Sequence, residues 1–234
     1  MIAVQTCAIA FDIDHTLAID NKLERIAFLR LLARIDGEGG RLLGTLDQET
    51  SAIDALLERQ RSGAFTIDDA VRRFVSERGV THTKPFVEHF REIVLSLVDH
   101  VVVPLPGVPR MLDELRARGI ATAVLSNGWS PLQQRKAERA GFAGPVLASA
   151  DVGAAKPDRS AFAALVDRLG LPAQCIWYVG DNPRTDVAGA HAAGLRTAWY
   201  NAEGRRYPGD LTPPDAVIAD ICDAVGLVTL AVGS

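Results

Sequence analysis

Cysteine is scarce in this chain. Its 234 residues include three cysteines, which lie far apart and form no Cys-x-x-Cys pair. A disulfide framework needs a larger and even set of cysteines, and a zinc site needs closely spaced pairs. We therefore expect Cys7, Cys175 and Cys222 to be small buried hydrophobic side chains in a reducing compartment.

A broad positive charge and a long apolar run are also missing. The 25 Lys and Arg residues are outnumbered by 29 Asp and Glu residues, which leaves a net charge of -4 and no basic field for a nucleic-acid backbone. No apolar stretch reaches the ~20 residues of a membrane span, and the first residues lack the pattern of a signal peptide. We expect a cytoplasmic protein that binds neither nucleic acid nor membranes. No feature of the sequence identifies a protein partner.

The apolar residues of the chain follow two kinds of pattern, one typical of strands and one typical of helices. They make up 48% of the sequence, enough for a sizeable core. The short apolar run at residues 7–11 ends in a polar cluster, which is typical of a buried strand. From residue 17 to residue 103 the apolar positions follow the period of a helix, until Pro104, Pro106 and Pro109 end the pattern.

Beyond residue 104 the chain alternates between helices and strands. We predict helices at 108–118, 131–140, 158–169 and 184–193, and strands at 120–125, 145–148, 175–179, 195–200 and 216–218. Such alternation indicates a parallel sheet with helices on both faces. The predicted fold class is α/β, with a Rossmann-like core of residues 1–16 and 104–234. An all-α cap domain, residues 17–103, is inserted after the first strand.

Polar side chains follow four of the predicted strands. In an open parallel sheet, ligands bind beyond the carboxyl ends of the strands, so residues at these ends should converge on one edge. In chain order, these residues are Asp12, Asp14, Thr16, Ser126, Asn127, Lys156, Asp181 and Asp186.

The carboxylates in this set indicate a metal ion. Asp12 and Asp14 are alternate residues of an extended segment and can share a face. Like charges so close together are costly without a cation, and Asp181 and Asp186 add to the repulsion. Oxygen ligands with this much negative charge suit Mg²⁺, with Mn²⁺ as an open alternative.

The other residues of the set supply a hydroxyl, an amide and an ammonium group. Ser126, Asn127 and Lys156 can surround a phosphoryl group and neutralise charge as it develops. Each residue alone also has an ordinary structural reading, such as a turn former, a solvated lysine or a helix-terminal acid. Their ordered appearance after successive strands favours the functional interpretation.

These residues carry a resemblance to a known family. The segment 11–17, Phe-Asp-Ile-Asp-His-Thr-Leu, resembles the D-x-D-x-T signature of the haloacid dehalogenase superfamily. Ser126 fits the second motif of that superfamily and Lys156 the third, and residues 180–186 are similar to the fourth, G-D-x-x-x-x-D. The resemblance extends over essentially the whole chain and includes a helical cap of the C1 type, as in the capped phosphatases.

The resemblance implies a role for each matching residue. Asp12 attacks phosphorus to form an aspartyl-phosphate. Asp14 protonates the leaving oxygen and then activates the water that hydrolyses the intermediate. The carboxylates of Asp12 and Asp181 and the backbone carbonyl of Asp14 bind the metal.

The remaining matches have supporting roles in the family. Ser126, Asn127 and Lys156 bind the phosphate, and Thr16 orients the loop of the first motif. Asp186 holds the waters of the metal or orients Lys156.

The implied activity is Mg²⁺-dependent hydrolysis of a small phosphorylated metabolite, such as a nucleotide or a sugar phosphate. Residues 126–136 and 154–158 are similar to the subgroup of nucleoside 5'-monophosphatases and acylneuraminate 9-phosphatases. A phosphomutase with the same motifs is the main alternative. A 2-haloacid dehalogenase is disfavoured because halide needs no proton and Asp14 is present, and a non-catalytic binding protein is disfavoured because no catalytic residue is missing.

Overall fold

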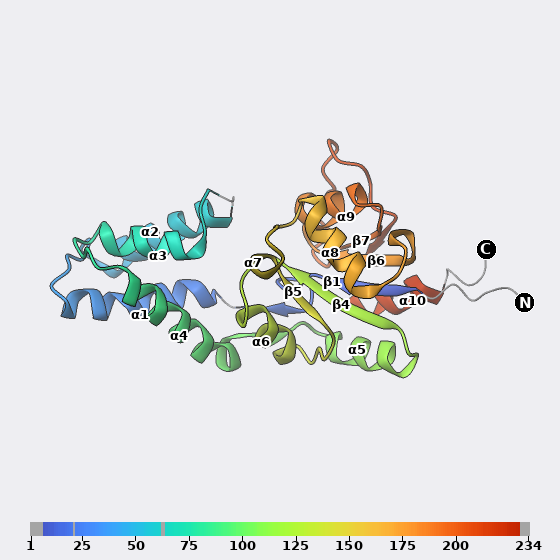
Figure 1. Cartoon of the computed structure of the whole chain (residues 1–234), viewed down its shortest axis with the longest axis horizontal. Helices are drawn as coiled ribbons and strands as arrows, with labels where there is room; N and C mark the ends of the chain where they lie inside the picture. The colour runs from blue at the N-terminus through green and yellow to red at the C-terminus, as the bar shows by residue number, and fades with distance from the viewer. Residues whose placement is uncertain (1–6, 21, 62–63, 230–234) are drawn as a thin grey trace, which may run out of the picture. The chain divides into compact units, whose positions relative to one another are not determined.

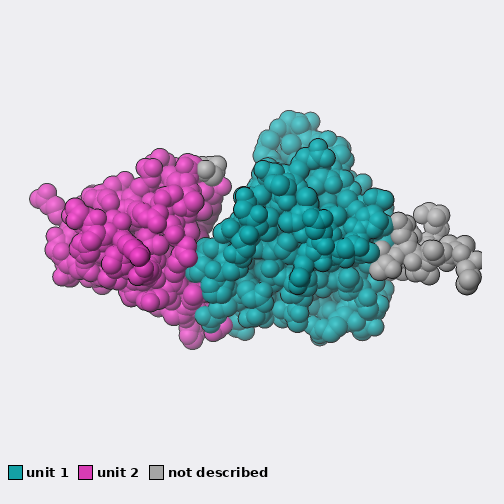
Figure 2. Space-filling model, viewed as in Figure 1, with its two compact units in different colours: residues 1–20, 102–234 teal, residues 21–101 magenta. Residues whose placement is uncertain are grey.

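The structure, a computed structural model, describes residues 7–20, 22–61 and 64–229. It divides into two compact units, coloured separately in Figure 2. The core unit comprises residues 1–20 and 102–234, and the helical unit comprises residues 21–101. Because the chain leaves the core unit and later returns to it, the helical unit is an insertion.

The core unit is built on a parallel sheet with the strand order β5-β4-β1-β6-β7-β8. The central strand β1 pairs with β4 on one side and β6 on the other, so that Phe11 lies opposite Val124 and Val179. This arrangement confirms the predicted α/β fold class. The strands are β1 (Ala8–Phe11), β4 (Ala121–Ser126), β5 (Val146–Ala148), β6 (Ile176–Gly180), β7 (Arg196–Tyr200) and β8 (Ala216–Ile218).

Helices cover both faces of this sheet (Figure 1). On one face, Phe162 and Leu165 pack with Tyr178 and Leu125 in a buried hydrophobic cluster. The rings of Phe162 and Tyr178 meet edge to face with centroids 5.1 Å apart. Burial of each large side chain of this kind contributes about 1.5–3 kcal/mol. The helices of the core unit are α5 (Val108–Ala117), α6 (Leu132–Arg139), α7 (Ser149–Val152), α8 (Arg159–Leu169), α9 (Ala188–Ala192) and α10 (Ala224–Thr229).

Shorter elements complete the core unit. A π-helical turn, η2 (Pro183–Val187), precedes α9, and 3₁₀ turns occupy Ala173–Cys175 and Ile221–Asp223. Near the points where the chain leaves and re-enters the unit, β2 (Ala18–Ile19) and β3 (Val103–Pro104) pair in an antiparallel manner. This small pair fixes the segment that follows the first motif.

The helical unit consists of α1 (Leu23–Gly37), α2 (Leu46–Arg61), α3 (Ile67–Ser76) and α4 (Lys84–Val101). Its core contains Phe28, whose ring contacts Phe74 and Phe90 at centroid distances of 5.0 and 4.7 Å. A buried ion pair between Arg78 and Glu49 lies in the same unit. These contacts give the insertion a hydrophobic core of its own.

The expectation for the cysteines is correct at one of the three positions. Cys175 is buried, whereas Cys7 and Cys222 are only partly buried. Across the described part of the chain, no helix combines the length and the apolar character that crossing a bilayer requires.

Candidate active site

Asp12 is the first residue after the central strand. Every side chain of β1 is buried, and the N–H group of Asp12 continues the strand pairing by donating to the carbonyl of Val179 at 3.0 Å. Its Oδ1 atom accepts a hydrogen bond from Nζ of Lys156 at 2.7 Å. Burial raises the pKa of the Asp12 carboxyl group, and the neighbouring Lys156 opposes this increase.

Lys156 connects three elements at the carboxyl edge of the sheet. Besides Asp12, its Nζ atom donates to Oδ1 of Asp186 at 2.7 Å and to the hydroxyl oxygen of Tyr178 at 3.0 Å. Tyr178 in turn donates to the carbonyl of Leu125 at 2.7 Å. Burial favours the neutral amine, but the two carboxylates outweigh it and hold the pKa of Lys156 well above its ordinary value. The ammonium group is therefore charged at neutral pH.

The backbone of Lys156 is fixed by Asn127. The Asn127 side chain donates to the Lys156 carbonyl at 3.0 Å and accepts from the Lys156 N–H group at 2.8 Å. Both ends of the amide are thus engaged by this loop, whereas the sequence predicted that Asn127 binds phosphate. Ser126 is buried at the end of β4, directly before Asn127.

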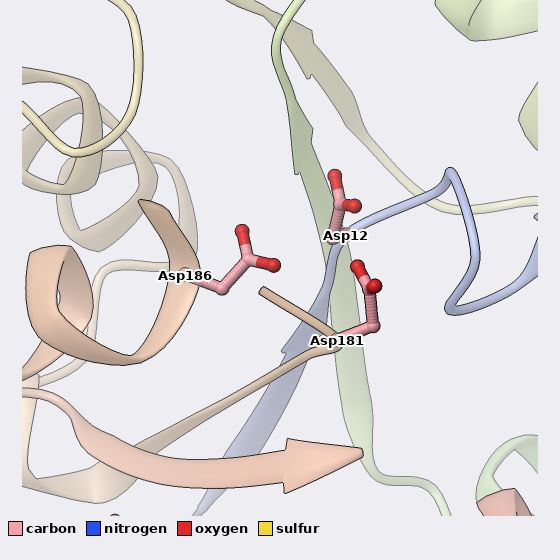
Figure 3. Close-up of side chains that lie close together, drawn as sticks. All are labelled: Asp12, Asp181 and Asp186. Atoms are coloured by element: carbon pink, nitrogen blue, oxygen red, sulfur yellow. The ribbon is translucent and has the colours of Figure 1, made fainter. Parts of the chain in front are cut away.

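Asp12, Asp181 and Asp186 form an acidic cluster. One carboxylate oxygen from each lies within 4.8 Å of the others, and Figure 3 shows the three side chains gathered from three different segments. Burial raises the pKa of all three carboxyl groups, and the mutual repulsion of the carboxylates adds to that effect. A donor set made of oxygen atoms alone, with excess negative charge, fits a hard divalent cation such as Mg²⁺ or Mn²⁺.

The wide turn η2 brings Asp186 into this cluster. Oδ2 of Asp186 accepts from the N–H group of Asn182 at 3.0 Å, and the Asn182 side chain accepts from the N–H groups of the next turn. The position also depends on Gly180, since a Cβ atom there would lie 2.4 Å from Oδ2 of Asp186. Of the two roles implied for Asp186, the structure places it in direct contact with Lys156.

Asp181 follows β6 and is held by residues of a later loop. Its backbone carbonyl accepts from Nε1 of Trp199 and from Nη2 of Arg205, each at 2.9 Å. Arg205 also approaches the Asp181 carboxylate at 3.5 Å. These bonds hold the residue on the edge of the sheet where Asp12 lies.

The carboxylate of Asp14 lies outside the acidic cluster, in contact with a different lysine. Its Oδ1 atom accepts from Nζ of Lys136 at 2.9 Å, and the same ammonium group donates to Oδ2 of Asp20 at 3.1 Å. Burial raises the pKa of Asp14, Lys136 lowers it, and the charges of Asp20 and Asp12 raise it further. The expectation that the paired carboxylates of Asp12 and Asp14 face one cation is therefore corrected for the Asp14 side chain.

The backbone explains why the two aspartates diverge. The N–H groups of Leu17 and Ala18 both donate to the carbonyl of Ile13, at 2.8 and 3.0 Å, so the chain turns sharply after Ile13. His15 adopts the left-handed region with φ 60°, which an extended segment excludes. Thr16 is buried in this turn, and its hydroxyl makes no hydrogen bond with the described residues, so its backbone N–H orders the loop instead.

Sequence reasoning missed Lys136, Asp20, Tyr178 and Arg205. Lys136 had a usable signal, since it lies four residues after Leu132 on the apolar face of α6, where a charged residue needs a partner. The other three occupy positions whose partners depend on the folding of distant segments.

Comparisons with known proteins agree with this geometry. The haloacid dehalogenase-like hydrolase family model matches residues 7–194. The pyrimidine 5'-nucleotidase YjjG of Escherichia coli is 32% identical over 126 residues, which cover 52% of this chain and 56% of that protein. The phosphoserine phosphatase of Thermus thermophilus is 38% identical over 119 residues, which cover 50% and 47%. The chain thus spans about half the length of these curated relatives.

A solved structure extends the similarity to nearly the full chain. The 2-haloacid dehalogenase of Pseudomonas syringae pv. Tomato DC3000 superposes with a TM-score of 0.71 and 25% sequence identity. The superposition covers 97% of this chain and 99% of the dehalogenase. Both phosphate and carbon–halogen chemistry therefore occur among proteins similar to this one.

Proposed function

The chain belongs to the haloacid dehalogenase-like hydrolase family, and we propose that it is a Mg²⁺-dependent phosphomonoester hydrolase of a small phosphorylated metabolite. The single observation that carries the proposal is the position of Asp14. Asp14 lies two residues after the nucleophile Asp12. Its carboxyl group is bound by Lys136 and is separate from the acidic cluster. An alkoxide leaving group needs a proton, so an acid at this position suits phosphate esters.

In the first half of the reaction, Asp12 attacks phosphorus. Lys156 orients the Asp12 carboxylate through the bond to Oδ1 and opposes the rise of its pKa on burial. As the bond between phosphorus and the leaving oxygen breaks, Asp14 transfers its proton to that oxygen and becomes a carboxylate. Ser126, the second N–H of the Asn127 side-chain amide and the backbone N–H groups beside them would bind the phosphoryl oxygens.

In the second half, Asp14 acts as the base. It accepts a proton from water, the resulting hydroxide attacks phosphorus, and the Asp12 carboxylate leaves. Phosphate is released and Asp14 is protonated again. Asp12 and Asp181, with the backbone carbonyl of Asp14, would hold Mg²⁺, which supplies positive charge to the phosphoryl oxygens when bound.

The substrate class is inferred from the relatives and the insertion. A nucleotidase and a phosphoserine phosphatase are among them, and both names denote small phosphorylated substrates. We propose that the helical unit acts as a cap that contacts the leaving group and excludes water. A nucleotide or a sugar phosphate is the expected substrate.

The test is phosphate release from a panel of nucleotides, sugar phosphates and phosphoglycolate, with and without Mg²⁺. Asp12→Asn should lower the rate by about 10³-fold or more, since loss of a nucleophile removes the covalent route. Asp167→Asn, an exposed position of α8, is the matched control and should retain wild-type activity. Release that survives Asp12→Asn would refute the assignment, and an isomerised sugar phosphate without free phosphate would identify a phosphomutase.

A 2-haloacid dehalogenase is the second candidate, because the superposed structure has that activity in its name. Halide leaves as a stable anion, so this reaction gives Asp14 no proton to donate. Chloride release from 2-chloropropionate, together with no phosphate release from the panel, would establish this candidate in place of the phosphatase.

A further inference from the structure

Lys136 links Asp14 to a carboxylate that lies in none of the sequence motifs. Its side chain is 3% exposed and extends from α6 to the loop after β1, where it bonds Asp14 and Asp20 at 2.9 and 3.1 Å. We propose that Lys136 is a positioning residue that aims the carboxyl group of Asp14 at the oxygen of the leaving group. The inference rests on the proposed function and assigns to it a residue that acts through Asp14.

The two bonds hold the first-motif loop at both ends. Asp14 lies near the start of the loop, and Asp20 follows β2 as the last residue of the core unit before the chain enters the helical unit. One buried ammonium group therefore restrains six consecutive peptide units, and α6 supplies the rigid support. An error of about 1 Å in the placement of a catalytic group can cost about 10²-fold in rate.

The contact leaves Asp14 able to react. The lysine binds Oδ1, and the Asp14 side chain is 33% exposed, in contrast to the 3% of Lys136. The carboxyl group is thus anchored through Oδ1, while a third of the side chain stays exposed. This is the arrangement that a general acid needs, since it must be held in place and still reach the substrate.

A purely structural ion pair is the competing explanation. Burying an ammonium group carries a desolvation cost, and replacing a whole buried ion pair by apolar residues of similar volume is often neutral or stabilising. Leu132 and Ala137 already line the same face of α6, so an apolar residue at position 136 would fit the helix pattern. A structural role predicts equal losses of activity on every substrate, whereas the orientation of Asp14 predicts a loss confined to substrates whose leaving group needs a proton.

The experiment compares two leaving groups in the Mg²⁺-loaded protein. The p-nitrophenolate ion leaves without a proton, whereas an alkyl alcohol must be protonated, so a misplaced acid affects alkyl substrates selectively. We would measure kcat/KM of Lys136→Met for p-nitrophenyl phosphate and for the best alkyl phosphomonoester of the panel. Lys136→Arg retains a cation, and Arg139→Met removes one from an exposed position of the same helix as a control.

The inference predicts that Lys136→Met lowers kcat/KM about 10²-fold for the alkyl substrate and no more than about threefold for p-nitrophenyl phosphate. Lys136→Arg should restore the alkyl rate to within about tenfold of wild type, and Arg139→Met should match wild type on both substrates. Equal losses on the two substrates, or no loss, would overturn the inference. If thermal melting shows Lys136→Met to be unfolded, Lys136→Gln takes its place and is judged by the same ratio.

The same measurements separate this inference from the proposed function. A wild-type enzyme whose phosphate release depends on Asp12, combined with equal losses in Lys136→Met, rejects the role of Lys136 alone. A wild-type protein that cleaves neither phosphate ester rejects both.

Discussion

Substitution of Lys156 by methionine should destabilise the metal-free protein strongly. The ammonium group bonds Asp12 and Asp186, each at 2.7 Å, and the three residues are 5%, 7% and 1% exposed. Methionine preserves most of the volume but leaves two buried carboxylates without their cation. Breaking a buried ion pair from one side costs about 3–5 kcal/mol of the free energy of unfolding. At about 2–4 °C per kcal/mol for a chain of this size, Tm should fall by about 6–20 °C.

Thermal unfolding followed by circular dichroism in EDTA measures this shift. Lys84→Met, at the exposed first residue of α4, is the matched control and should change the free energy of unfolding by less than about 0.5 kcal/mol. Millimolar Mg²⁺ should raise the Tm of Lys156→Met more than that of wild type, since the variant has more uncompensated charge. A fall of less than about 3 °C in EDTA would refute the reasoning, because the two carboxylates would then not depend on the lysine.

Two further predictions concern the acidic cluster. Burial raises the pKa of Asp12, Asp181 and Asp186 above 3.8, so the folded protein is more stable when these carboxyl groups are protonated. The stability that their protonated forms contribute is fully present below about pH 4 and is lost as the pH rises through their pKa values in the folded state. Mg²⁺ competes with those protons, so the increase in Tm that Mg²⁺ causes, measured by calorimetry, should be larger at pH 7 than at pH 5. Equal increases at the two pH values would contradict the metal assignment. Gly180→Ala should cost about 1–3 kcal/mol in stability and reduce the Mg²⁺-dependent gain in Tm, because its Cβ would displace Asp186, a member of the acidic cluster. Gly209→Ala is the control: its Cβ meets no atom within 4 Å, so the stability and the Mg²⁺-dependent increase in Tm should both be unchanged. An Mg²⁺-dependent increase in Gly180→Ala equal to that of wild type would show that Asp186 need not lie where the structure has it.

The strands of the core could be predicted because each is a short apolar run that ends in polar residues. The expected strand at 120–125 is found at Ala121–Ser126, and that at 175–179 is found at Ile176–Gly180. Each begins and ends one residue later than expected, because backbone pairing sets the limits and hydrophobicity does not: pairing with β1 sets the starts, and pairing with β5 and β7 sets the ends. The antiparallel pair β2–β3 was not predicted, because two-residue strands have no detectable period.

The expected helix at 184–193 is wrong in its first half. Residues Pro183–Val187 form a π-helical turn, in which the N–H group of Val187 donates to the carbonyl of Asn182, and α9 begins only at Ala188. Wide turns of this kind are associated with functional sites. Here the turn lets Asp186 reach Lys156, a requirement of the site that no helical periodicity records.

The site itself was predictable to the extent that the sheet determines it. Residues after parallel strands meet at one edge whatever their distance in sequence, which is why Asp12, Lys156 and Asp186 could be grouped in advance. Which carboxylate pairs with which lysine could not be predicted in this way. That depends on the turn after Ile13 and on the rotation of α6, both of which are set by tertiary packing.

The pairing of two aspartates with two lysines has a chemical consequence. In the proposed mechanism, Asp12 must be ionised to attack, whereas Asp14 must start the reaction with its proton, although the two residues are two positions apart. In each case a buried lysine is shared between two carboxylates, Asp12 with Asp186 and Asp14 with Asp20. The lysines alone therefore do not distinguish the two aspartates. A divalent cation in the acidic cluster would lower the pKa of Asp12, a member of the cluster, more than that of Asp14, whose carboxylate lies outside it. In the proposed mechanism, cation binding would thus ionise Asp12 while Asp14 keeps its proton.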